Sequence, residues 1–303
     1  MKKIIQIFIQ ITIIIGLFYH FVNSDYSLEH LYLLNFTKIL IITLLIFLGN
    51  ILRSAQLQSF TEALGDKISY LNAFCITVGG TLVNYLPLNA GIFVKASALK
   101  KLNIKYAHFI SIYSVEILVT AISSSFFCLI SLIFSPFNYN INTDKLFIFL
   151  GCIFICSIIG LMAKSAWIQS WEGKVLSIVK NFIIGIEQIV QRKKILLLIF
   201  YFVNLRLLII ALVTYVCFLS LGADLSLVGS IFVATATSLL MVINITPGGI
   251  GIREVVLGLI SSTTGGEFEL GVLASLIMRG CSMMVHLLFG IPSLLYLKKS
   301  KIF

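Results

Sequence analysis

Long apolar runs, each about the length of a membrane-spanning helix, alternate along this chain with short polar or basic segments. A bilayer core takes about 20 apolar residues per helix, and the runs allow about six to eight such elements. They take up nearly all of the 303 residues, of which 59% are hydrophobic and 11% charged. The sequence therefore predicts an all-α polytopic integral membrane protein, with one transmembrane domain over residues 1–303 and no folded soluble domain.

Positive charge gathers in short loops and at both ends of the chain, and this explains the net charge of +10 without nucleic acid as a partner. Lys and Arg favour the cytoplasmic loops of membrane proteins. Lys2 and Lys3 therefore place the N-terminus in the cytoplasm, and Lys298 and Lys299 place the C-terminus there. We expect a multi-pass protein of the cell membrane with both termini inside.

The same rule and the lengths of the runs predict about six full spans and two re-entrant hairpins. One hairpin enters from the cytoplasm after an interfacial segment at 54–66, because the apolar run 68–86 is followed at once by lysines that belong inside. The other, over about 225–262, enters from the opposite side. The full spans cover about residues 4–22, 33–52, 106–134, 146–163, 195–220 and 270–297.

Both hairpins are broken by the same pattern, which recurs after 160 residues as Asn84-x-x-Pro87-x-x-x-Gly91-Ile92 and Asn244-x-x-Pro247-x-x-x-Gly251-Ile252. Proline and glycine interrupt a helix, and the freed backbone groups need protein or a wet cavity around them. We expect these prolines and glycines, with Gly248 and Gly249, to shape the breaks. The recurrence predicts two halves of inverted topology, 1–134 and 146–297, with a substrate site where the breaks meet near the midplane.

Ionisable residues beside the breaks are the first candidates for that site, because charges within membrane segments are costly and usually face a cavity or each other. Arg253 follows the second break, and Lys95 follows the first. Half-helix N-termini near Gly251 and Ile92 would add N–H groups that suit a phosphate or carboxylate. We expect Arg253 and Lys95 to meet an anionic headgroup.

Other charged residues lie deep in the predicted helices. Glu254 is expected to orient a basic neighbour such as Arg279 or Lys95, and a purely structural ion pair for Arg253 and Glu254 is the alternative. If the halves are inverted copies, Glu116 and Arg279 occupy comparable positions, and we expect them to pair across the interface.

Four further polar residues have either a structural role or a role in the substrate site. Arg206 lies in mid-span, either as a site residue or as a snorkelling or paired side chain. His286 is expected to be packed and hydrogen-bonded. Asn84 and Asn244 are expected to cap the freed backbone at the breaks, with substrate contact as a second role.

The cysteines form no Cys-x-x-Cys or Cys/His cluster, so we predict neither a metal site nor a disulfide framework. No catalytic residue and no cofactor is assigned. The six thiols lie in apolar segments, at Cys75, Cys128, Cys152, Cys156, Cys217 and Cys281.

The stretch from Pro247 to Glu254, with Arg279 in the last span, resembles the transmembrane domain family of the lysylphosphatidylglycerol synthases, the flippase-like membrane part of the multiple peptide resistance factors. Leu86-Pro87 with Gly91 and Lys95 is similar to that family's first motif. Two positions depart from it, since Ile92 and Ile117 stand where the family commonly has an acidic residue and an arginine. Glu116 is retained. Without the soluble aminoacyl-transfer domain, lysine transfer is not expected.

The resemblance implies a flippase that moves an anionic or phosphate-linked headgroup between leaflets, with a membrane phospholipid or lipid-linked glycan as partner. Two alternatives stay open. One is an enzyme, a membrane-embedded transferase that uses a polyprenyl-phosphate or phospholipid substrate, and the other is an organic-anion transporter.

Overall fold

A computed structural model describes residues 35–63, 65–85, 90–104, 106–134, 143–162, 183–184, 186–240, 251–263, 267–300 and 302. Every regular element within these ranges is helical. The labelled helices are α3 (Phe36–Ala63), α4 (Tyr70–Val83), α5 (Ala90–Lys101), α6 (Tyr106–Phe134), α7 (Thr143–Met162), α9 (Lys193–Ser220), α10 (Leu227–Leu240), α11 (Ile252–Thr263) and α12 (Phe268–Lys299).

Five of these helices, α3, α6, α7, α9 and α12, are long and apolar enough to cross a membrane. The predicted all-α polytopic fold is thereby confirmed. The observed α6 has the predicted bounds, and α7, α9 and α12 begin and end within three residues of theirs. The first predicted span, about 4–22, lies outside the described residues.

α3 is longer than predicted, because it continues without a break to Ala63 instead of ending near residue 52. The expected interfacial segment at 54–66 is largely the last part of this helix. The chain then turns at Gly65, whose φ of 95° is left-handed, and Asp66 N–H donates to Thr61 O over 2.9 Å. This is the closing bond of a glycine-terminated helix.

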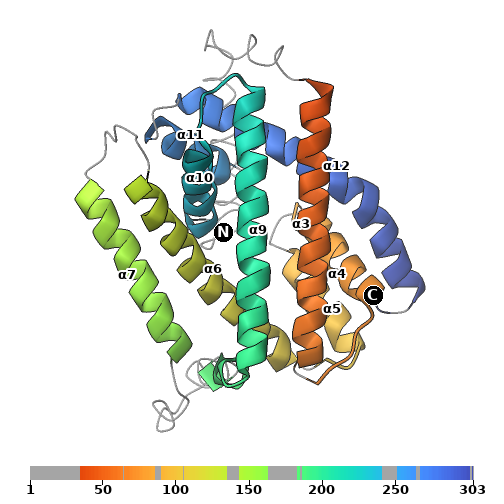
Figure 1. The fold of residues 1–303 in the computed structure, drawn as a ribbon. Helices are drawn as coiled ribbons and strands as arrows, with labels where there is room; N and C mark the ends of the chain where they lie inside the picture. Colours follow the sequence, from red (N-terminus) through yellow and green to blue (C-terminus); the bar gives the residue numbers. More distant parts are fainter. Residues whose placement is uncertain are drawn as a thin grey trace, which may run out of the picture.

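The two predicted hairpins appear as pairs of short helices. α4 packs on α5 and α10 packs on α11, and Figure 1 shows the first pair in the lower part of the molecule and the second in the upper part. α4 and α10 have 14 residues each, which is too few for a full crossing of about 20 residues. The loops that join the two helices of each hairpin, at 86–89 and 241–250, are outside the described residues.

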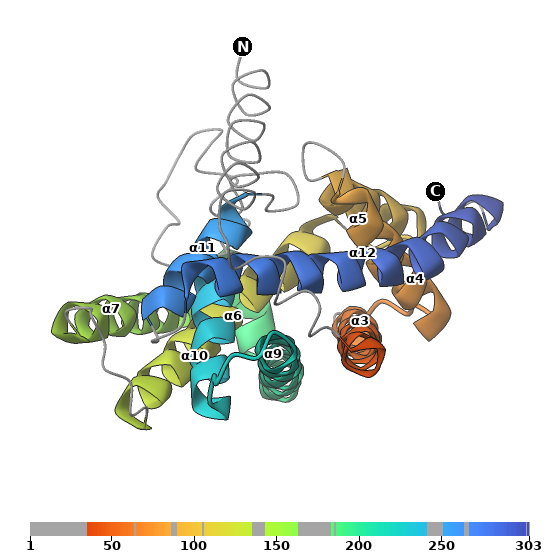
Figure 2. The same cartoon turned by 90° about the horizontal axis from the view of Figure 1, so that it is seen from above.

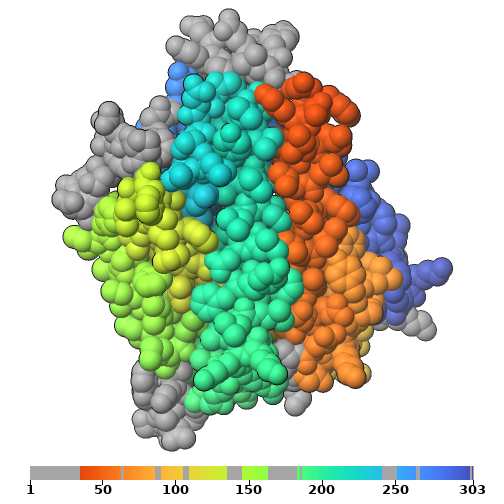
Figure 3. Space-filling view, viewed as in Figure 1, coloured from red at the N-terminus to blue at the C-terminus, as the bar shows by residue number. Residues whose placement is uncertain are grey.

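α3 and α9 lie side by side along one face of the bundle (Figures 1 and 3). They run antiparallel, because Lys38 Nζ near the start of α3 donates to Leu219 O near the end of α9 over 3.0 Å. α12 runs behind them across the width of the bundle (Figure 2). It packs on α4 and α11, while α6 packs on α10 and α7.

Helix lengths recur along the chain. α3 and α9 have 28 residues each, α4 and α10 have 14, and α5 and α11 have 12. The first helix of each hairpin also packs against the last helix of the other predicted half, α4 on α12 and α10 on α6. Both regularities are of the kind expected for two related halves. The division into halves 1–134 and 146–297 stays a prediction.

The distribution of side chains suits a lipid surround. Leu197 and Tyr201 on α9 are more than half exposed, as are Ile133 and Phe134 at the end of α6. Small polar side chains face inward instead, and some of their hydroxyls donate hydrogen bonds to their own helix, as Ser114 Oγ does to Ile110 O over 2.6 Å. The buried serines of α6 are Ser111, Ser114, Ser123, Ser124, Ser125 and Ser131.

Candidate functional site

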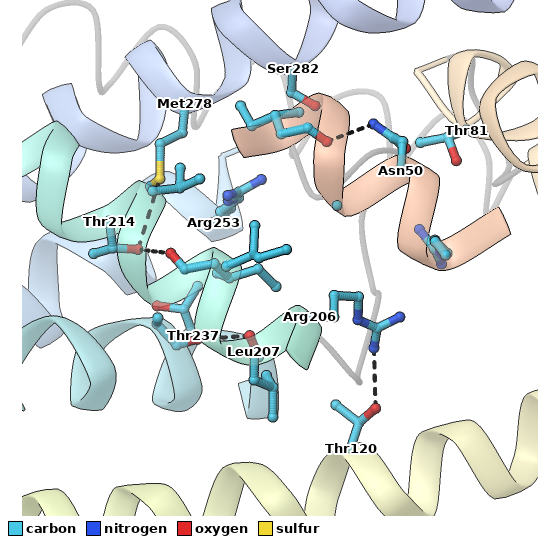
Figure 4. Close-up of a pocket in the computed structure, with 18 of the residues that line it drawn as sticks. Asn50, Thr81, Thr120, Arg206, Leu207, Thr214, Thr237, Arg253, Met278 and Ser282 are labelled. Carbon is cyan, nitrogen blue, oxygen red and sulfur yellow. Dashed lines mark hydrogen bonds between the residues drawn. The ribbon is translucent and has the colours of Figure 1, made fainter. Parts of the chain in front are cut away.

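A cavity of about 460 Å³ lies inside the bundle, between α3, α4, α6, α9, α10, α11 and α12 (Figure 4). This volume is in the range of about 300–1,000 Å³ that is usual for small-ligand sites. Its lining combines aliphatic side chains with three guanidinium groups, one carboxylate and many hydroxyls. The polar lining residues are Asn50, Arg53, Thr81, Tyr113, Glu116, Thr120, Arg206, Thr214, Thr237, Ser238, Arg253, Ser282 and His286.

Arg206 of α9 is held by two residues of α6. Its Nη1 lies 2.5 Å from Glu116 Oε1 in a salt bridge, and its Nη2 donates to Thr120 Oγ1 over 3.3 Å. Glu116 and Thr120 are four residues apart, so both point from the same face of α6. Arg206 is therefore ion-paired and lines the cavity at the same time, which combines the two roles that the sequence left as alternatives.

Glu254 is buried at the start of α11 and satisfies two partners. One carboxylate oxygen lies 3.1 Å from Arg279 Nε, and the other accepts the Gly251 N–H over 2.7 Å. A carboxylate three residues after the capping position is one half of a capping box. Gly251 has a φ of 83°, which strongly favours glycine. Of the two basic neighbours expected for Glu254, Arg279 and Lys95, Arg279 is the one paired with it, and its role at a substrate site stays a prediction.

The predicted Glu116–Arg279 pair is not formed; each residue has another partner in the structure. Glu116 bonds Arg206, and Arg279 bonds Glu254. The reason is packing, because α12 lies directly against α11 and Glu254 reaches Arg279 there. α9 likewise brings Arg206 to α6.

Among the basic side chains that line the cavity or lie beside it, three make no hydrogen bond or ion pair within the described part of the chain, namely Arg53, Lys95 and Arg253. Arg53 and Arg253 line the cavity. Lys95 lies beside it, since a Cβ atom on Gly80 of α4 would be 2.7 Å from the Lys95 Cγ and Cε atoms. A half-buried cation without an acceptor is costly in a low-dielectric interior, so this arrangement suits an anionic ligand.

Arg53 was missed by sequence reasoning, which placed it at the cytoplasmic end of its span. The signal was present in the spacing of Ile46, Asn50 and Arg53, because positions i, i+4 and i+7 share one helix face. All three line the cavity. Arg53 therefore belongs to the candidate site.

The first hairpin is packed backbone to backbone. A Cβ atom on Gly91 would lie 1.8 Å from Gly80 O and 2.4 Å from Asn84 Oδ1. Asn84 ends α4, and its backbone N–H donates to Thr81 O over 3.1 Å, whereas its side-chain oxygen has no hydrogen-bond partner within the described residues. Its predicted capping and substrate roles stay predictions. The remaining predicted site and break residues lie outside the described residues, namely Asn244, Pro87, Pro247, Gly248 and Gly249.

His286 of α12 is hydrogen-bonded to its own helix and to α3, as expected for a packed histidine. Its Nδ1 lies 2.6 Å from Ser282 O on α12 and its Nε2 lies 3.2 Å from Asn50 Oδ1 on α3. Tyr85, which follows α4, donates its hydroxyl to Ser282 Oγ over 3.1 Å.

The charge of the lining decides what the cavity can hold. Among the described residues, three arginines and one glutamate line it, and no group of three or more His, Cys, Asp or Glu side chains is arranged to hold a metal ion. Arginine binds phosphate and carboxylate through paired N–H groups. The arrangement therefore favours binding of an anion over chemistry by paired carboxylates.

A family model described as the lysylphosphatidylglycerol synthase TM region matches residues 7–290 of the chain. The match covers almost the whole of the sequence, including every residue of the cavity lining. No curated protein matches the chain, and no solved structure does.

Proposed function

Because the chain belongs to the lysylphosphatidylglycerol synthase TM region family, whose members are related to lipid handling, we propose that it moves an anionic lipid headgroup between the two leaflets. The observation that carries this proposal is the arginine-lined cavity inside a bundle whose outer surface is apolar. Arg253 is the central residue, because it stands at the start of α11 and lines the cavity without an acceptor in the described part of the chain.

The physical obstacle to headgroup movement is desolvation of its charge. An isolated ionised group costs on the order of tens of kcal/mol in a medium of low dielectric constant. A guanidinium that donates two parallel N–H bonds to a phosphate replaces part of the lost hydration. The hydroxyls of Thr81, Thr120, Thr214 and Thr237 offer further bonds to the headgroup along the cavity wall.

The two hairpins supply a route from both sides. In this proposal α4 with α5 and α10 with α11 enter from opposite sides and leave the cavity between their ends, as in transporters built from inverted repeats. Exposed basic residues gather at one end of the bundle, among them Lys67, Lys100, Lys101, Arg192, Lys193, Lys194, Lys298 and Lys299. We assign that end to the cytoplasm of a cell membrane, with the C-terminus on the same side.

The test is headgroup movement in liposomes that hold the purified full-length chain. Phosphatidylglycerol with a fluorescent acyl chain is followed with a membrane-impermeant quencher, which reaches only the outer leaflet. We expect quenching of inner-leaflet lipid in the presence of the protein, and a rate that falls about tenfold to a hundredfold in Arg253→Gln, as for loss of hydrogen bonds to a charged group.

Two matched variants control the experiment. Arg253→Lys keeps the charge and is expected to retain part of the rate, while Lys299→Gln removes an exposed charge at the end of α12 and is expected to change nothing. An undiminished rate in folded Arg253→Gln would contradict the proposal. Uptake of glycerol phosphate without lipid movement would favour the organic-anion transporter, and transfer of a headgroup to a second lipid would favour the transferase.

A further inference from the structure

A second cluster of positive charge lies at the cavity apart from Arg253, and it consists of Arg53, Arg206 and Lys95. Arg53 and Arg206 line the cavity, and Lys95 lies against Gly80, the neighbour of the lining residue Thr81. Among the described residues, Glu116 is the one carboxylate that lines the cavity, and it is paired with Arg206. The formal charges of these described residues therefore leave two positive charges in excess. The nearby breaks at 86–89 and 241–250 contain no ionisable residue.

The antiparallel packing of α3 on α9 brings the two arginines to one level. A Cβ atom on Gly49 would lie 3.8 Å from Ile209 Cγ2. Four residues along α3 from Gly49 is Arg53, and four residues back along α9 from Ile209 is Leu205, the neighbour of Arg206. Because Glu116 and Thr120 hold Arg206 from α6, its guanidinium is fixed in orientation and still has unused N–H donors. Arg53 has all of its donors unused within the described residues.

This cluster is separate from the surroundings of Arg253. Arg253 stands at the start of α11 beside the Glu254–Arg279 pair, and neither member of that pair belongs to the first cluster. Met278, the neighbour of Arg279, lies 4.0 Å from Thr214 Oγ1 of α9, and Thr214 is eight residues beyond Arg206, which is about 12 Å along a helix at 1.5 Å per residue. Arg253 with the Glu254–Arg279 pair has one positive charge in excess. The cavity thus has two cationic ends of unequal charge.

The unequal charge points to a choice between phosphate groups. A phosphomonoester carries about −1.5 to −2 near pH 7, whereas a phosphodiester carries a single charge. Two uncompensated cations in a low-dielectric site are best neutralised by the doubly charged group, since each uncompensated buried charge is costly. Resting on the function proposed above, we propose that Arg53, Arg206 and Lys95 form a subsite that selects phosphomonoester headgroups over phosphodiester headgroups.

The experiment compares two lipids that differ only at the phosphate. Dioctanoyl phosphatidic acid is the phosphomonoester, and dioctanoyl phosphatidylglycerol is the phosphodiester. Their Kd values for the detergent-solubilised full-length chain are measured near pH 7. We expect phosphatidic acid to bind at least about tenfold more tightly, as for one additional charge-assisted contact. Glycerol phosphate is the soluble monoester probe, and we expect it to compete weakly because it lacks acyl chains.

Three variants assign the effect to the cluster. Arg53→Gln is expected to bring the ratio of the two Kd values close to one, and Arg53→Lys is expected to keep most of the difference. Arg253→Gln is expected to weaken the binding of both lipids and to leave the ratio unchanged. Equal Kd values in the unaltered chain, or an unchanged ratio in folded Arg53→Gln, would overturn the subsite. The first of these measurements needs no variant to fold.

The outcomes separate the two proposals. Binding of both lipids with equal Kd values, together with intact headgroup movement, overturns the subsite alone. Binding of neither lipid, together with no headgroup movement, overturns the proposed function as well. Competition by glycerol phosphate as strong as that of phosphatidic acid supports the phosphomonoester subsite and assigns it to a soluble phosphate, against the lipid function.

Discussion

Replacing Glu254 by Gln is expected to destabilise the fold by about 3 kcal/mol, because it breaks a buried ion pair without changing side-chain volume. The Glu254 side chain is 3% exposed and Arg279 is 16% exposed. The substitution retains an oxygen that can accept the Gly251 N–H, so the cap at α11 survives. What is lost is the negative charge next to Arg279, which then remains in the interior without compensation from Glu254.

The expected cost of Glu254→Gln is compared with that of the same substitution in the other ion pair, Glu116–Arg206. Glu116 and Arg206 are 16% and 17% exposed and both line the cavity, so the Glu116 carboxylate is less buried than that of Glu254, which is 3% exposed. We expect Glu116→Gln to cost only about 1 kcal/mol, close to the value for partly exposed pairs. The structure therefore predicts an ordered difference between two chemically identical substitutions, with Glu254 the more important for stability.

The assay is reversible unfolding in mixed detergent micelles, with SDS as the denaturant and helical circular dichroism as the signal. A cost of about 3 kcal/mol corresponds to more than a hundredfold in the unfolding equilibrium. Arg279→Gln and the double variant complete a cycle, and we expect the two changes to be non-additive by more than about 1 kcal/mol. Additive costs, or a smaller cost for Glu254→Gln than for Glu116→Gln, would refute the reasoning.

Two further predictions concern packing and exposure. Gly91→Ala places a Cβ atom 1.8 Å from Gly80 O, so we expect α4 and α5 to separate and the folded yield in detergent to fall sharply. The control is Gly151→Ala, which should leave the yield unchanged because no atom lies within 4 Å of the added Cβ. An equal loss of yield in both variants would contradict the close contact. Cys152 and Cys156 are exposed, while Cys128 and Cys217 are buried. A maleimide should therefore label the first two cysteines in the native protein and all four only after unfolding, as measured by mass spectrometry of peptides. Labelling of Cys128 or Cys217 in the native state would count against the described packing.

Much of the fold followed from hydropathy, because bilayer thickness sets the length of a span and basic loops set its side. α6 is predicted at its observed bounds, since an apolar run of uniform character is flanked by Lys105 and by Ser135-Pro136. The predicted span over α3 was too short, because it was ended at a basic residue. The rule that assigns arginine to a membrane surface ended the span at Arg53, although the helix continues for ten more residues and turns that arginine into the cavity.

Pairing of charges was the part that sequence reasoning did not reach. Arg253, Glu254 and Arg279 were recognised because each interrupts an apolar segment, and a local rule, the carboxylate three residues after a capping glycine, explains Glu254. The partner of Glu116 depends instead on how α6 crosses α9, which no short spacing encodes. The assumption that the halves carry equivalent charges led to Arg279, whereas the structure places Arg206 there.

Helix lengths recur between the two predicted halves, but the charges do not. The Arg53, Arg206 and Lys95 cluster lies on α3, α9 and α5, and Glu116 is the one carboxylate that lines the cavity there among the described residues, whereas the Arg253 end lies on α11 and α12 and contains its own buried pair. Two predicted halves that share helix lengths but not charges give two ends that cannot hold a phosphate equally well. Under the proposed function the headgroup therefore resides mainly at the Arg53 end, and Arg253 receives it more weakly from the other side. Substitution of Arg53 is then expected to lower the occupancy of the Arg53 end relative to the Arg253 end, and substitution of Arg253 is expected to do the opposite. Neither substitution is expected to change the geometry of the hairpins.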